Sequence, residues 1–141
     1  MNKKLQKYIT SYELLKSYER DIIHPDGGMI LLVNLGSNFD FIIEDETYTL
    51  KQNQAVLINA LERDLYLNEY KELALIRFKG AGASFFLEEH METLMFEPLL
   101  PIFLEEEIIT EFNEKELDKY FQNRFKASSL PFNIMKIVEL L

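Results

Sequence analysis

The chain has 141 residues, 48% of them hydrophobic, which fits one domain with a single hydrophobic core. It contains no cysteine, which excludes thiol catalysis, disulfide bonds and cysteine-ligated zinc. The 24 acidic and 15 basic side chains give a formal net charge of −9, so we expect no nucleic-acid-binding surface within this chain. The first residues lack the features of a signal peptide, and no apolar run is long enough to span a membrane, so we expect a cytoplasmic protein with no membrane partner.

The first half of the chain alternates short apolar runs with turn residues every eight to twelve positions, as antiparallel β-sheets do. The clearest turns are Pro25-Asp26-Gly27-Gly28 and Gly36-Ser37-Asn38. We predict strands over residues 10–16, 22–24, 29–34, 39–44, 47–50, 55–59, 65–70 and 73–78.

After Gly80 the composition shifts to Leu, Glu, Lys and Phe, which predicts a helical second half of the same domain. Helices are expected over residues 81–92, over residues 113–126, and from Ser128 or Ser129 to residue 141. The predicted fold class is therefore α+β: an antiparallel, cupin-like β-barrel over residues 1–80 followed by helices over residues 81–141.

The middle helix has the strongest pattern. Asn113 is placed to cap its first turn, and Arg124 suits its last turn. One stripe of its surface is apolar, at Leu117, Tyr120, Phe121 and Phe125. This stripe would either pair two copies of the chain or pack the helix onto the barrel.

Enzymatic chemistry is poorly supported by the residue inventory. The only histidines are His24 and His90, with no His-x-His pair, whereas a transition-metal site needs three or four convergent ligands. No serine lies in a Gly-x-Ser-x-Gly elbow. We therefore expect a protein that is not an enzyme and holds no metal or other cofactor. A cupin-type, metal-dependent isomerase or oxygenase is the alternative, with His24 among its ligands.

Two features could recognise an anion. The stretch FKGAGASFF, residues 78–86, leads from a strand into a helix, but it lacks the remaining residues of a dinucleotide or P-loop motif, so we interpret it as a turn that needs small residues. Arg77 lies inside the otherwise apolar strand LALIRF and must find a carboxylate, an exposed edge or a ligand. It would form a salt bridge or recognise an anion at the mouth of the barrel.

The stretches HPDGGMILLVNLG, LALIRFKGAGASFFL, LDKYFQNRF and IMKIVELL occur in that order over nearly the whole chain. In order and spacing they resemble the N-terminal domain of one branch of the AraC-type bacterial transcriptional regulators. The family-marker turn is Pro25, Asp26 and Gly27. The other matching positions are Asn34, Leu35, Gly36, Arg77, Phe78 and the small residues after Lys79.

The resemblance implies a cupin-like barrel with helices that senses an effector or dimerises. Two helix-turn-helix motifs, which are absent from this chain, would bind DNA from a region C-terminal to it. We expect a homodimer formed through Leu117, Tyr120, Phe121 and Phe125, and an unidentified small-molecule effector. A freestanding module that pairs with a full-length regulator is a further alternative. Strand alternation suggests the pocket lining as Met29, Leu31, Val33, Phe39, Phe41, Ile58, Tyr66 and Arg77.

Overall fold

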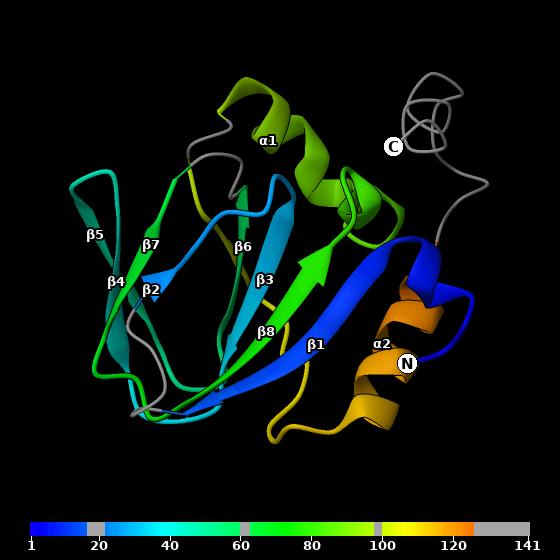
Figure 1. Cartoon of the computed structure of the whole chain (residues 1–141), viewed down its shortest axis with the longest axis horizontal. Coiled ribbons are helices and arrows are strands. Elements are labelled where there is room, and N and C mark those ends of the chain that lie inside the picture. The colour runs from blue at the N-terminus through cyan, green and yellow to red at the C-terminus, as the bar shows by residue number, and fades with distance from the viewer. Residues whose placement is uncertain (17–21, 60–62, 98–99, 126–141) are drawn as a thin grey trace.

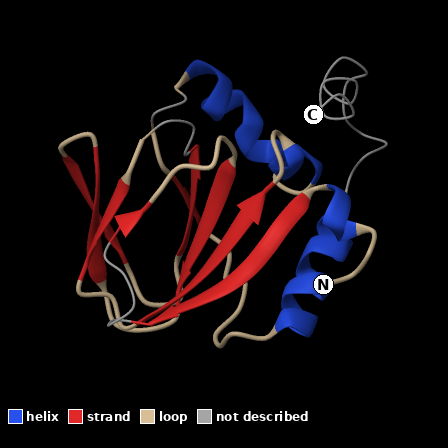
Figure 2. Cartoon of the chain, viewed as in Figure 1, coloured by secondary structure: helices blue, strands red, loops and turns tan. Residues whose placement is uncertain are grey.

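A computed structural model describes residues 1–16, 22–59, 63–97 and 100–125 of the chain (Figures 1 and 2). Strands dominate the first part and short helices the second, in agreement with the predicted α+β class. The strands are β1 (Ile9–Lys16), β2 (Ile22–Ile23), β3 (Met29–Asn34), β4 (Phe39–Ile43), β5 (Glu46–Leu50), β6 (Ala55–Asn59), β7 (Leu65–Asn68), β8 (Glu72–Phe78) and β9 (Ile102–Leu104). The α-helices are α1 (Met91–Phe96) and α2 (Glu114–Arg124), and the 3-10 helices are η1 (Leu5–Lys7), η2 (Gly82–Phe85) and η3 (Glu88–His90).

The strands form two antiparallel sheets rather than one closed barrel. One sheet has the order β1-β8-β3-β6-β9 and the other the order β2-β7-β4-β5. Within the described part of the chain, the edge strands of one sheet are not hydrogen-bonded to those of the other. The expected closed barrel is therefore not found, because the two sheets are joined by side-chain packing between their faces.

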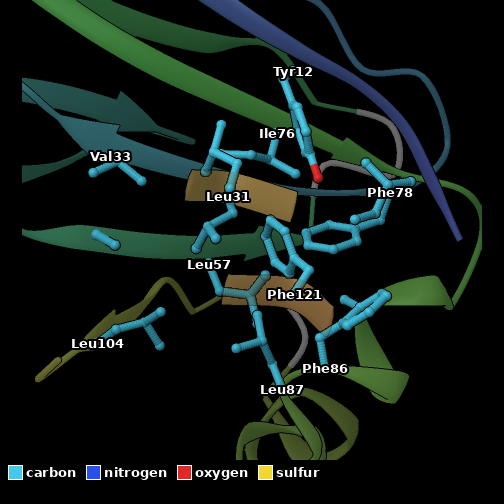
Figure 3. Close-up of a cluster of buried hydrophobic side chains, with 14 of the residues drawn as sticks. Tyr12, Leu31, Val33, Leu57, Ile76, Phe78, Phe86, Leu87, Leu104 and Phe121 are labelled. Carbon is cyan, nitrogen blue, oxygen red and sulfur yellow. The ribbon is translucent and has the colours of Figure 1, made fainter. Parts of the chain in front are cut away.

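The five-stranded sheet is buried on both faces, so the molecule has three layers (Figure 1). Within β3, Ile30 and Leu32 pack against the four-stranded sheet, whereas Leu31 and Val33 pack beneath the helices (Figure 3). A strand buried on both faces is apolar at every position, which explains the unbroken run MILLV.

The end of β3 is held by Asn34, which is fully buried. Its side-chain amide donates to the carbonyl of Ser37 at 3.0 Å and to that of Leu50 at 2.9 Å, and its side-chain oxygen accepts from the amide of Gly36 at 3.0 Å. A side chain at Gly36 would overlap Lys71, so this turn requires glycine. The Asn-Leu-Gly stretch is thus a structural corner.

The structure confirms all eight predicted strands to within two residues at either end, and α2 is capped by Asn113 as predicted. The helix predicted over residues 81–92 is wrong in type: two 3-10 turns precede α1, and in the first of them Gly82 packs directly against the Tyr8 backbone. Strand β9 was not predicted. The helix predicted to run to residue 141 lies outside the described residues.

Candidate functional site

Arg77 is the centre of a charged cluster at one end of the sheets. Along β8, Leu75 faces the other sheet and Ile76 faces the helices, so strand alternation turns Arg77 toward the space between the sheets. Its side chain is 15% exposed. An arginine this buried needs partners for its guanidinium.

Two carboxylates supply those partners. Nε of Arg77 donates to Oε2 of Glu13 in β1 at 2.9 Å, and Nη1 donates to Oδ2 of Asp26 at 3.4 Å. The salt-bridge interpretation of Arg77 is therefore correct in this structure. One positive and two negative charges leave the cluster with a net charge of −1. The Asp26 contact is the longer of the two, which makes Asp26 the partner that a competing anion would replace more readily.

The turn at residues 25–28 holds Asp26 in place beside Arg77. Oδ1 of Asp26 accepts a hydrogen bond from the amide of Gly28 at 3.0 Å, and Gly27 has a φ of 85°, which favours glycine. A side chain at Gly28 would overlap the carbonyl oxygen of Phe78, so the turn packs closely against the end of β8. The sequence therefore uses two adjacent glycines to bring Asp26 to an arginine 51 residues away.

Strand β1 connects the Arg77 cluster to helix α2. Glu13 faces Arg77, whereas the neighbouring Tyr12 points to the opposite face of the strand and is 8% exposed (Figure 3). The Tyr12 hydroxyl donates to Oδ1 of Asp118 in α2 at 2.8 Å, and its ring stacks on Phe121 with centroids 6.1 Å apart. Burial, and then Asp118, raise the pKa of Tyr12, so its hydroxyl stays protonated as the donor.

A second cluster fixes the C-terminal end of α2. Nε of Arg124 donates to the carbonyl of Phe86 at 3.0 Å, Nη1 donates to Glu106 at 3.1 Å, and Nη2 contacts Glu89. The hydroxyl of Tyr120 also donates to Glu106, at 2.9 Å. Burial lowers the pKa of Arg124, whereas burial and Glu106 raise that of Tyr120. The end of α2 is thus tied to two separate segments of the chain.

Some of the expected pocket residues do face the space between the sheets. Phe39, Phe41 and Ile58 belong to the cluster that fills this space, and Arg77 lies at its end. Of the expected pocket residues, Phe39 also lines a surface hollow, together with Asn38 and Lys71.

The other four expected pocket residues do not face the space between the sheets. Leu31 and Val33 are buried beneath the helices, and Met29 packs against that same cluster. Tyr66 faces outward from β7 and is 45% exposed. Because residues 29–33 of β3 are all apolar, their alternation carried no signal for which face meets the other sheet.

The apolar stripe of α2 packs mainly onto the five-stranded sheet. Leu117 and Phe121 are fully buried within one chain and so cannot reach a second copy. Tyr120 is partly buried against the cluster beneath the helices, and Phe125 is 40% exposed. Of the four residues expected at a dimer interface, Phe125 is therefore the most accessible.

The two histidines lie in different settings. Nδ1 of His24 lies 3.0 Å from Asp64, and the His24 side chain is 72% exposed. Burial lowers the pKa of His90, and Glu106 partly opposes this shift. No group of three or more His, Asp or Glu side chains that could hold a metal ion occurs among the described residues. In the same part of the chain, no helix is long and apolar enough to cross a membrane.

A second mostly buried arginine, Arg63, was not singled out from the sequence. Its side chain is 16% exposed; Nε lies 3.4 Å from Glu44, and Nη2 donates to the carbonyl of Asn59 at 3.2 Å. Nη1 of Arg63 and Oδ1 of Asn59 are buried with no hydrogen-bond partner in the structure. Arg63 matches Arg77 in charge and exposure, but its contacts, Glu44 and Asn59, lie in other parts of the chain.

Three further residues of these clusters were not predicted from the sequence: Glu13, Tyr12 and Asp118. An acid inside the amphipathic strand TSYELLK was the only signal for Glu13. Nothing in the spacing of the chain relates Tyr12 to Asp118, which lies 106 residues away.

No family model and no curated protein matches the chain. Solved structures with a similar arrangement include ToxT from Vibrio cholerae O395 bound to (E)-4-(8-methylnaphthalen-1-yl)but-3-enoic acid, with 10% identity and a TM-score of 0.44 over 90% of this chain and 51% of that chain. ToxT in a P21 crystal form gives 10% identity and a TM-score of 0.42 over 92% of this chain and 52% of that chain. The chain spans about half the length of these proteins.

Proposed function

We propose that this chain is the non-catalytic regulatory domain of an AraC-type transcription regulator, acting in the cytoplasm as a homodimer. It senses a small molecule, and a region C-terminal to it binds DNA. The order of the Pro-Asp-Gly turn, the Asn-Leu-Gly corner and the Arg-Phe strand supports the family. The antiparallel sheets followed by helices support a binding domain of this kind.

The observation that carries the proposal is the pair of contacts made by adjacent residues of β1. Glu13 binds Arg77 on the inter-sheet face, and Tyr12 binds Asp118 of α2 on the other face. A change at Arg77 therefore has a direct physical route to the helix that leads into the C-terminal part of the chain.

The ligand suited to this site is a small carboxylate that carries an apolar group. Its carboxylate would replace Asp26 at Nη1 of Arg77, where the existing contact is 3.4 Å long. Its apolar group would enter by displacing side chains of the aliphatic and aromatic cluster that fills the layer between the sheets. Release of Asp26 would free the turn before β3, so the ligand would favour a second arrangement of β1 and α2.

Binding of octanoate and naphthaleneacetate, each compared with its uncharged amide, tests the proposal by NMR titration of the chain. We expect saturable shifts for the acids at residues 26–28 and in α2, and none for the amides. Arg77→Gln should weaken binding at least about tenfold, the effect of losing a charged contact of about 1.4 kcal/mol. Arg63→Gln is the matched control and should bind like the wild type. The ligand site is refuted if neither acid binds, or if both variants bind equally.

A further inference from the structure

A phenylalanine projects from the helical layer into solvent. Phe96, at the end of α1, is 79% exposed, which makes it the most exposed of the large apolar side chains that the structure describes. Leu94, two residues earlier, is only 4% exposed and belongs to the core beneath the helices. Helix α1 is therefore anchored by one apolar side chain and presents another outward. An exposed aromatic ring on an anchored element is typical of a residue that binds a partner.

The surroundings of Phe96 are acidic. Residues 88–97 contain four glutamates and neither lysine nor arginine. Glu92 precedes Phe96 by four residues and so lies on the same face of α1, and Glu97 follows Phe96 directly. Both of these glutamates are exposed. Phe96 with Glu92 and Glu97 thus forms an apolar knob that carries two negative charges.

A hollow with the complementary character lies between the N-terminal residues and the end of α2. Its volume is about 660 Å³, and its lining includes the aromatic residues Tyr8 and Phe125 and the exposed lysines Lys4 and Lys7. None of the described residues that line it is acidic, although the whole chain has a net charge of −9. Phe125 is 40% exposed, and its ring stacks on that of Phe85, 5.8 Å away at 11°. A hollow of this size has room for a phenyl ring.

We propose that the hollow of one copy of the chain receives Phe96 of a second copy. The incoming ring would pack against Tyr8 and Phe125, and the two glutamates of the knob would face the two lysines of the hollow. Phe96 does not fill the hollow of its own chain, since it is 79% exposed and does not line that hollow.

A two-fold dimer uses both surfaces of each copy. Each copy carries one knob and one hollow, so a two-fold pair buries both, whereas a head-to-tail contact leaves one of each exposed and continues into a chain of molecules. In Figure 1, α1 and the hollow beside α2 and the N-terminus both belong to the helical layer, so one side of the molecule presents them together. This interface rests on the homodimer of the proposed function and is independent of the ligand site at Arg77.

Sedimentation of the whole chain over a range of concentrations tests the contact. Phe96→Ser should raise the dimer dissociation constant at least about thirtyfold, because an aromatic anchor is lost twice in a two-fold dimer. Tyr66→Ser is the matched control, since Tyr66 is another exposed ring but lies on β7 in the four-stranded sheet, and it should leave the constant unchanged. A dimer that Phe96→Ser and Tyr66→Ser affect alike would overturn this contact alone. A wild-type chain that stays monomeric up to about millimolar concentration would overturn the homodimer as well.

Charge reversal tests the pairing of the two surfaces. The hollow variant carries Lys4→Glu and Lys7→Glu, and the knob variant carries Glu92→Lys and Glu97→Lys. Each variant by itself places like charges in both contacts, so its dimer should be weakened at least about tenfold. An equimolar mixture should form a heterodimer close to the wild-type affinity, because both contacts then pair opposite charges again. A mixture that associates no better than either variant alone would overturn the proposal.

Discussion

The two faces of the five-stranded sheet are both buried, but they are covered in different ways. The inter-sheet face is covered by other strands, and apart from Tyr70 every residue of its core lies in a strand. The opposite face is covered largely by residues outside the strands, among them Leu5, Phe86, Leu117 and Phe121. Both faces bring together segments distant in sequence, since β4 and β5 are the one hydrogen-bonded pair of described strands that are consecutive in the chain. Strand β1 connects the two faces, because Glu13 contacts Arg77 on one face and Tyr12 contacts Asp118 on the other.

The largest expected effect is loss of the aromatic centre beneath the helices. Phe121 is fully buried and contacts the rings of Phe78, Phe86 and Tyr12. Phe121→Ala should lower the free energy of unfolding by about 3–5 kcal/mol, measured by urea denaturation. Phe125→Ala is the control and should cost about 1 kcal/mol or less, because much of its ring is already exposed. Equal losses of unfolding free energy in the two variants would contradict the assignment of Phe121 to the buried core.

Adjacent residues of β3 separate the two faces more sharply. Leu31 and Leu32 are both fully buried, but Leu31 faces the helices and Leu32 faces the other sheet. Each Leu→Ala change should cost about 2–5 kcal/mol. At matched global stability, Leu31→Ala should speed amide exchange in α2 and Leu32→Ala should speed it in β4. The same pattern for both variants would contradict the two-face assignment.

A smaller effect is expected for the hydroxyl that joins β1 to α2. Tyr12→Phe removes the hydrogen bond to Asp118 and should cost about 1 kcal/mol in urea denaturation. Tyr120→Phe also removes a bond from α2 to a carboxylate, but that bond is exposed, so its loss should cost less. A larger loss of unfolding free energy in Tyr120→Phe than in Tyr12→Phe would contradict the role of Tyr12 as the link between β1 and α2.

The smallest effect concerns pH. Burial lowers the pKa of His90 below its ordinary 6.5, so folding favours the neutral ring. The stability from this preference is fully present above about pH 6.5 and is lost as the pH falls toward the lower pKa of the folded state. His90→Gln should therefore flatten the fall in unfolding free energy just below pH 6.5.

The strands and the capped helix α2 could be predicted because their signals are local: turn residues, alternation and the Asn113 cap. The orientation of β3 could not, because a strand buried on both faces has no polar side to mark its register. The partners of Arg77 were predictable only as a class, since Glu13 and Asp26 lie 64 and 51 residues away. The hydrogen bond that links β1 to α2 could not be predicted, because Tyr12 and Asp118 are brought together only by folding.

Amide hydrogen exchange in Arg77→Gln tests most directly whether β1 couples the Arg77 cluster to α2. With β4 as the internal reference, we predict that Arg77→Gln speeds exchange of the α2 amides from Leu117 to Arg124, in addition to those of β1 and the turn before β3. Arg63→Gln, an equal loss of charge at equal exposure, should leave α2 unchanged. The account is contradicted if the change in Arg77→Gln stops at β1, or if both variants affect α2 alike.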